Sequence, residues 1–237
     1  KRSWMDLGNV NDLSALSKSS NVYMFHIAMR LGGADYSYNA PLSIDINAFN
    51  TFRSYFSQFG LGVYTGIDVN NEGLGYRGFA SLGGHLLDFA IGQYDTYTTI
   101  QLAQYVATIA NDGVRVQPRL LLKSLVNDTQ IVSYENTVTV LNQLNDFESL
   151  KRVQDGFRLC VTDGLCRSLN NPNVSVAAKT GTAENFIYPE DADSFDAPNS
   201  TLVSYAPFEN PEIAIACAAP HAWNTTSQAN ICLSITN

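Results

Sequence analysis

The segment Ala178-Lys179-Thr180-Gly181-Thr182-Ala183-Glu184 concentrates groups that could bind an anionic substrate. It continues an apolar stretch with the composition of a β-strand, and a lysine in such a strand is costly to bury unless an anion meets it. Gly181 removes a side chain where a ligand backbone could approach, and the neighbouring threonines supply hydroxyls. If the strand lies at a sheet edge, its free backbone N–H groups could also bind an oxyanion. The simpler interpretation is a strand that ends in a polar turn.

A second polar group, Ser19-Ser20-Asn21, stands at the start of the apolar run 21–31. Serine and asparagine are preferred at helix N-caps, so the simpler interpretation is a cap. Taken together with Lys-Thr-Gly, however, Ser-x-Asn has the form of a motif of the penicillin-recognising serine enzymes. We therefore expect the two segments to face one shared cleft.

The elements that would position these groups are predicted from periodicity and from caps. The predicted helices span about 21–31, 47–58, 99–111 and 147–161. The first is apolar nearly all round, which indicates a buried helix, and Gly32-Gly33 ends it. Asn145 or Asp146 can cap the last helix, and Glu148 can pair with Arg152 on its outer face. The glycine-rich stretch 60–84 is predicted to be a long loop, and His85, directly after it, is also assigned to this loop region.

Short β-rich segments replace this helical pattern after Asn171-Pro172. We predict strands over Val174–Thr180, Thr201–Ala206 and Glu212–Ala219, which together form an antiparallel sheet. The acidic stretch Pro189–Asp196 between the first two is predicted to be a solvated loop. The chain is therefore of the α+β class, with a helical part over about 1–170 and a sheet part over about 171–237.

Composition limits the class of protein further. The chain has 237 residues, of which 45% are hydrophobic and 15% charged, enough for one domain with a substantial core. Its formal net charge of −8 argues against binding to nucleic-acid phosphates. No apolar run has the length of a membrane span, and the chain opens Lys1-Arg2-Ser3-Trp4 without a signal peptide.

The four cysteines do not follow a zinc-binding pattern, because there is no Cys-x-x-Cys and the histidines are scattered. They are Cys160, Cys166, Cys217 and Cys232, and the histidines are His26, His85 and His221. We therefore predict no metal site. Buried free thiols are the expected state of the cysteines, with a Cys160–Cys166 disulfide as the alternative.

Several further motifs show that the chain resembles the transpeptidase domain of a class B penicillin-binding protein, of the Gram-positive elongation type. The matching segments, in the order of that family, are Leu13-Ser14-Ala15-Leu16, Ser19-Ser20-Asn21-Val22-Tyr23, Phe59-Gly60-Leu61-Gly62, Thr65-Gly66-Ile67-Asp68, Ala90-Ile91-Gly92-Gln93, Gln101-Leu102-Ala103, Ala110-Asn111-Asp112-Gly113 and the Lys-Thr-Gly-Thr-Ala-Glu strand. The resemblance covers nearly the whole chain. It implies the fold shared by penicillin-binding proteins and serine β-lactamases, an antiparallel sheet packed with a helical subdomain.

One motif of that family does not occur in this sequence. The family's nucleophile is the serine of Ser-x-x-Lys, and no serine here has a lysine three residues later. Ser17-Lys18 and the pair Ser175 and Lys179 are near misses. We therefore expect residues 1–237 to be a C-terminal portion of the domain, inactive alone, whose parent carries the nucleophile and a membrane anchor upstream. Without the family's central helix, exposed core surface is expected.

The resemblance also implies roles for individual residues. Ser19 would relay a proton, Asn21 would bind the donor-peptide amide, and Lys179 would attract the terminal carboxylate. The Thr180 and Thr182 hydroxyls would orient that carboxylate beside Gly181, and the Thr182 N–H would form half of an oxyanion hole. No metal or organic cofactor is implied. Solvated charge is expected for Glu184 and the stretch 191–196, and a structural role for His221.

The expected activity is cross-linking of peptidoglycan stem peptides that end in D-Ala-D-Ala, on the extracytoplasmic face of the cell membrane. Expected partners are these peptides, β-lactam antibiotics and a membrane glycosyltransferase of the wall-synthesis complex, with no nucleic acid. Two alternatives stay open. One is a serine β-lactamase or D,D-carboxypeptidase of the same superfamily, and the other is a non-catalytic homologue that serves as a cell-wall scaffold.

Overall fold

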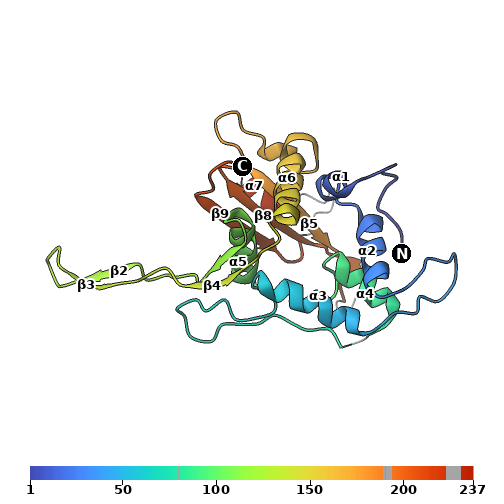
Figure 1. Ribbon diagram of the computed structural model, residues 1–237, viewed down its shortest axis with the longest axis horizontal. Helices are drawn as coiled ribbons and strands as arrows, with labels where there is room; N and C mark the ends of the chain where they lie inside the picture. The colour runs from blue at the N-terminus through green and yellow to red at the C-terminus, as the bar shows by residue number, and fades with distance from the viewer. Residues whose placement is uncertain (80, 189, 191–193, 223–230, 237) are drawn as a thin grey trace.

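A three-stranded antiparallel sheet carries the lysine segment in the computed structural model, which describes residues 1–79, 81–188, 190, 194–222 and 231–236. Its strands are β5 (Ala177–Ala183), β8 (Asn199–Ala206) and β9 (Ile213–Ala219), in the spatial order β5-β8-β9 (Figure 1). The register runs from Ala177 opposite Tyr205 to Ala183 opposite Asn199. These strands confirm the predicted antiparallel sheet, but β5 begins and ends three residues later than predicted, so Lys179 to Ala183 lie within this edge strand.

Helices pack against the sheet, and a hydrophobic core lies between them. Helix α5 (Thr99–Ala110) contacts β8 and β9, and α6 (Phe147–Asp163) contacts β5. Helix α7 (Ile231–Thr236) contacts β8 and β9, and the short 3₁₀ helix Arg167–Leu169 lies between α6 and β5 in the chain. The core between α5, α6 and the sheet consists of Val106, Ile109, Ala110, Leu150, Phe157, Ala177, Val203 and Tyr205. Asp146 caps α6 by accepting a hydrogen bond from Ser149 N at 3.0 Å.

A second group of helices packs around its own core (Figure 1). It contains α2 (Asn21–Leu31), α3 (Asn47–Gln58) and α4 (Gly83–Ala90), preceded by the short α1 (Asp12–Ser17), which contacts α6. Its buried residues are Phe25, Ala28, Met29, Ala48, Phe49, Leu86, Leu87 and Phe89. The bounds of α2 and α3 agree with the predicted ones.

Helix α2 is less covered than its sequence predicts. Only Phe25, Ala28 and Met29 are buried, whereas Val22, Ile27 and Leu31 are exposed apolar side chains. The expectation of a helix buried all round is therefore wrong for the described residues. The reason is that the elements present cover only one side of α2.

A long β-ribbon projects from the body of the molecule (Figure 1). At its base β1 (Val114–Val116) pairs with β4 (Val140–Gln143), and farther out β2 (Lys123–Leu125) pairs with β3 (Val132–Glu135). The sequence predicted no strands here. The Asp68 carboxylate accepts hydrogen bonds from Leu120 N and Leu121 N at 2.7 and 3.0 Å, and these bonds lower its pKa.

The cysteines are not free thiols as expected. They form two disulfides, Cys160–Cys166 and Cys217–Cys232. The turn after α6 returns the chain so that the Cα atoms of the first pair lie 5.0 Å apart. Docking of α7 on the sheet brings the Cα atom of Cys232 within 5.6 Å of that of Cys217. The expectation of free thiols was wrong because the second pairing depends on tertiary packing.

Two local expectations also differ from the structure. His85 lies in α4, so it does not belong to a loop. Arg152 makes a bidentate ion pair with Asp12 of α1, at 2.7 and 2.6 Å, instead of pairing with Glu148. The second difference arises because a contact distant in sequence outweighs the local pattern.

The acidic stretch 189–196 lies partly outside the described residues. Its last part, Phe195–Asp196, forms β7 and pairs with β6 (Phe186–Ile187), so it is a short strand and not only a loop. Nearby, His221 N donates to Asn199 Oδ1 at 2.9 Å at the start of β8. No helix within the described residues is long and apolar enough to cross a membrane.

Candidate active site

The Ser-x-Asn and Lys-Thr-Gly segments meet through a direct contact between two side chains. Lys179 Nζ donates a hydrogen bond to Ser19 Oγ at 2.9 Å, across 160 residues of chain. The same ammonium group donates to Thr180 O at 2.6 Å. Edge strand β5 and the turn before α2 thus face each other, which is the juxtaposition that the sequence led us to expect.

The lysine sits in an unusual electrostatic environment. Its side chain is half-buried, and within the described residues it forms no ion pair with a carboxylate. Two oxygen acceptors compensate for the lost water only in part, so desolvation lowers the pKa of Lys179 to about 8. An amine with this pKa can both attract an anion and exchange a proton with Ser19 near neutral pH.

The two serines in the turn between α1 and α2 have different roles. Ser20 is the N-cap of α2 and its side chain accepts a hydrogen bond from Tyr23 N at 3.3 Å. Ser19 adopts a left-handed backbone conformation with φ of 53°, which is uncommon for a residue with a Cβ atom. The capping interpretation therefore holds for Ser20, whereas the Ser19 hydroxyl is directed to Lys179.

The other predicted site residues lie on the same two segments. Asn21 is the first residue of α2 and is half-buried, and its carboxamide has no hydrogen-bond partner in the part of the chain that the structure describes. Thr182 is exposed, and Thr180 is half-buried. The structure therefore leaves a carboxamide two residues from Ser19 in the chain, and a hydroxyl three residues from Lys179, that a ligand could use.

The structure shows a reason for glycine at position 181 that the sequence did not reveal. A Cβ atom at this position would lie 2.2 Å from Oγ1 of Thr201, which is its partner on β8. The neighbouring strand thus occupies the space next to Gly181. Thr201 was missed because its importance depends on strand register, which a single sequence does not specify.

A cavity of about 860 Å³ adjoins this end of β5. Gly181, Thr182 and Ala183 form one wall of it together with β8 and β9. The opposite walls are largely aromatic and aliphatic and include Phe56, Phe59, Phe89, Leu102, Tyr105, Ile109, Leu150 and Val153. An apolar space of this size between helices and sheet agrees with the expectation of uncovered core surface.

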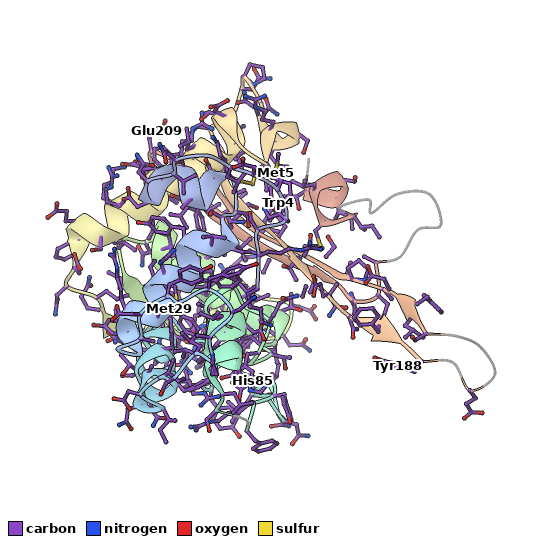
Figure 2. The ribbon with its side chains drawn as sticks, turned by 90° about the vertical axis from the view of Figure 1, so that its right-hand side faces the viewer. Trp4, Met5, Met29, His85, Tyr188 and Glu209 are labelled. Atoms are coloured by element: carbon purple, nitrogen blue, oxygen red, sulfur yellow. A yellow bond between two sulfur atoms is a disulfide. The ribbon has the colours of Figure 1, made fainter. Side chains whose placement is uncertain are left out.

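Trp4 is a site residue that the sequence did not suggest. Its indole Nε1 donates a hydrogen bond to Ser19 O at 3.1 Å. Trp4 lies on the face of the molecule that also carries α1 and α2 (Figure 2). It stands in a segment without regular structure, where no periodicity marks a residue as important.

The described residues contain no cluster of His, Cys, Asp or Glu that could hold a metal ion. The groups that the arrangement offers are a lysine amine, a serine hydroxyl, an amide side chain and backbone donors on a sheet edge. Such groups suit the binding of a peptide carboxylate and the transfer of a proton during acyl transfer.

Comparisons with known proteins agree with this geometry. The family model "Penicillin binding protein transpeptidase domain" matches residues 3–235. Penicillin-binding protein 2A of Bacillus subtilis is 47% identical over 247 residues, covering 100% of this chain and 34% of that protein. Penicillin-binding protein 2B of Streptococcus pneumoniae is 36% identical over 230 residues, covering 92% of this chain and 33% of that protein.

A solved structure of penicillin-binding protein 2B from Streptococcus pneumoniae superposes with a TM-score of 0.86 at 33% identity, covering 98% of this chain and 40% of that one. The chain thus spans about a third of the length of the curated relatives that it matches. Those relatives are class B penicillin-binding proteins of Gram-positive bacteria. The chain belongs to the penicillin-binding protein transpeptidase family.

Proposed function

We propose that this chain forms the substrate-binding part of a serine D,D-transpeptidase that cross-links peptidoglycan stem peptides. The observation that carries the proposal is the 2.9 Å contact between Lys179 Nζ and Ser19 Oγ, on segments 160 residues apart. This contact joins two family motifs and provides the close approach that proton transfer during acyl transfer to a serine needs.

In this proposal the nucleophilic serine comes from a Ser-x-x-Lys segment elsewhere in the parent protein. Its hydroxyl oxygen attacks the D-Ala–D-Ala carbonyl, an ester forms, and the terminal D-Ala leaves with the transferred proton. An amine of a neighbouring stem peptide then attacks the ester, which forms the cross-link and restores the serine. Ser19 would carry protons between Lys179 and the reacting groups.

The remaining residues would bind the donor peptide. The Lys179 ammonium would attract its terminal carboxylate, with the hydroxyls of Thr180 and Thr182 orienting that group beside Gly181. Asn21 would bind the peptide amide. Thr182 N–H would donate to the carbonyl oxygen as it gains negative charge, a type of donor whose loss costs about 3 kcal/mol of transition-state stabilisation.

The segment with the nucleophile would also complete the core in this proposal. The apolar cavity of about 860 Å³ ends at Gly181, Thr182 and Ala183, so a helix that fills it could present a serine to this part of β5. Burial of the aromatic walls would supply the free energy for that docking. The chain alone would then be inactive.

The same site would be acylated by β-lactam antibiotics, which mimic the donor peptide. We further propose that the parent protein is anchored in the cell membrane, acts on its extracytoplasmic face, and works with a membrane glycosyltransferase of the wall-synthesis complex. The two disulfides support an extracytoplasmic location, because disulfides persist in oxidising compartments.

The test is covalent labelling by a fluorescent penicillin in a form of the protein that contains the Ser-x-x-Lys segment. We expect Lys179→Ala to abolish labelling while the melting temperature shows a folded protein. Lys18→Ala is the matched control, because it removes an exposed lysine next to Ser19 and should leave labelling unchanged. Labelling of the Lys179→Ala variant at the wild-type rate would refute the assigned role.

The chain of 237 residues provides a second arm of the test. Because no serine has a lysine three residues later, we expect no covalent labelling of this chain by the same penicillin. Stoichiometric acylation of it would show that the nucleophile lies within these residues and would overturn the proposed division of the site.

A further inference from the structure

The backbone of Ser19 needs an external support. With φ of 53° it occupies the left-handed region, where the Cβ atom of a serine is unfavourable. Residues held in such conformations near functional sites persist when the surrounding structure determines them. Ser19 N donates to Leu16 O at 3.2 Å and Ser20 N to Ala15 O at 2.8 Å, so α1 holds the amide side of the turn.

The carbonyl side of the turn is held by Trp4. Its indole Nε1 lies 3.1 Å from Ser19 O. Among the described residues, no other hydrogen-bond donor to this carbonyl is found. The Trp4 side chain is 52% exposed, so core packing does not explain its position. The hydrogen bond from Nε1 to Ser19 O accounts for the position of the Trp4 side chain.

The segment that carries Trp4 is itself fastened to the helical body. At its start Lys1 Nζ forms an ion pair with the Asp88 carboxylate of α4, at 2.6 and 2.8 Å. Three residues later the Trp4 indole reaches Ser19 O in the turn between α1 and α2. The segment thus forms a strap from α4 to the turn that bears Ser19.

We propose that Trp4 is a positioning residue for Ser19. By holding the Ser19 carbonyl, its indole N–H stabilises the left-handed turn from which the Ser19 hydroxyl meets Lys179 Nζ at 2.9 Å. The consequence for catalysis rests on the proposed transpeptidase function, but the geometric effect on Lys179 does not. Trp4 acts through Ser19 and need not touch the substrate.

Two substitutions separate the N–H group from the aromatic ring. Trp4→Phe keeps a ring of similar position without a donor. Trp4→His restores a donor, because Nε2 of the five-membered imidazole ring can occupy the place of the indole Nε1. A purely packing role would favour Phe over His, whereas the proposed role requires His to function better than Phe.

The first readout needs no enzymatic activity and uses the 237-residue chain. The pKa of the Lys179 amine is measured by NMR in wild type and in both variants. Loss of the Ser19 acceptor weakens stabilisation of the ammonium form, so we expect Trp4→Phe to move this pKa below its wild-type value near 8 and Trp4→His to restore it. An unchanged pKa in Trp4→Phe overturns the proposal.

The second readout is the rate of β-lactam acylation in a form of the protein with the Ser-x-x-Lys segment. We expect Trp4→Phe to lower the acylation rate constant about 10-fold with unchanged non-covalent binding, and Trp4→His to recover most of it. In a Ser19→Ala background, Trp4→Phe should have no further effect. An equal effect in both backgrounds overturns the proposal, because Trp4 would then act independently of Ser19.

The two readouts distinguish failure of this inference from failure of the proposed function. If no form of the protein reacts with a β-lactam, the transpeptidase proposal fails, and the Lys179 pKa still decides whether Trp4 positions Ser19. Thermal unfolding of each variant verifies that the comparison concerns folded protein.

Discussion

The same three residues occur in two strands of this molecule with opposite surroundings. Val132-Ser133-Tyr134 lies in β3 of the projecting ribbon, and Val203-Ser204-Tyr205 lies in the central strand β8. Tyr134 is 48% exposed and Tyr205 is 1% exposed. Both triplets form antiparallel pairs, so the tripeptide is compatible with a strand in either place.

The difference comes from what covers each strand. β8 has a neighbour strand on both sides, α5 over one face and α7 in contact with it as well, so that four consecutive residues from Leu202 to Tyr205 are buried. The ribbon is two strands wide, and every residue of β3 is exposed. Local sequence thus specifies the strand, whereas packing decides whether the strand contributes to the core and can hold a site.

The largest expected effect contrasts the two tyrosines. Tyr205→Ala should lower the free energy of unfolding by about 3–5 kcal/mol, because it leaves a cavity in the core between α5, α6 and the sheet. Tyr134→Ala should change it by no more than about 0.5 kcal/mol. Urea unfolding of both variants measures the contrast, and equal losses would mean that the ribbon is buried in solution.

The disulfides should make the sheet region sensitive to reduction. Replacing both Cys217 and Cys232 by serine removes a link across a separation of 15 residues and should cost about 3 kcal/mol of unfolding free energy. The same change at Cys160 and Cys166, with a separation of 6 residues, should cost about 2 kcal/mol. Urea unfolding gives the ranking, and stability that is insensitive to dithiothreitol in the wild type would contradict both predictions.

A lysine of the sheet and a lysine of the ribbon should also differ in their effect on stability. This effect is smaller, and here the substitution in the sheet should raise the free energy of unfolding. The pKa of Lys179 falls from 10.5 in the unfolded chain to about 8 in the folded one, so its charge destabilises the fold below pH 8. Lys179→Met should therefore raise the free energy of unfolding at pH 7 by about 1–3 kcal/mol, after allowance for partial exposure.

The pH dependence gives the sign of this effect. The unfolded chain binds the proton more tightly between pH 8 and pH 10.5, so wild-type stability should rise with pH across this window and the advantage of Lys179→Met should disappear. Lys123→Met, at an exposed lysine of β2, is the matched control and should show no such slope. A Lys179→Met variant that is less stable than wild type at pH 7 would contradict the prediction.

The bounds of α2, α3, α5 and α6 were predictable to within two residues because their signals are local, whereas α1 and α4 were not predicted. Ser20, Asp146 and the glycines after Leu31 mark the ends of α2 and α6, and these residues act within one turn of the helix. The three sheet strands were predictable because apolar alternation marks them and Asn210-Pro211 separates the last two. The ribbon was missed because its short strands are irregular, with register shifts after Arg115 and Ser124.

The candidate site was predictable as a set of residue types and only partly as an arrangement. Ser19, Asn21 and Lys179 stand out through their motifs, and the structure joins the first and the last directly. The support from Trp4 and the approach of Thr201 to Gly181 could not be predicted. Each depends on where a distant segment comes to lie, and no local spacing encodes that.

By itself, the sequence determined α2, α3, α5, α6 and the three strands of the sheet, and the chemical groups that the site contains. Caps, periodicity and apolar alternation act over a few residues, so each segment carries this information alone. Only the tertiary structure decided which strand is buried, which cysteines join and how far the Lys179 pKa falls. These properties depend on solvent exclusion and on the distance between atoms that are far apart in the chain.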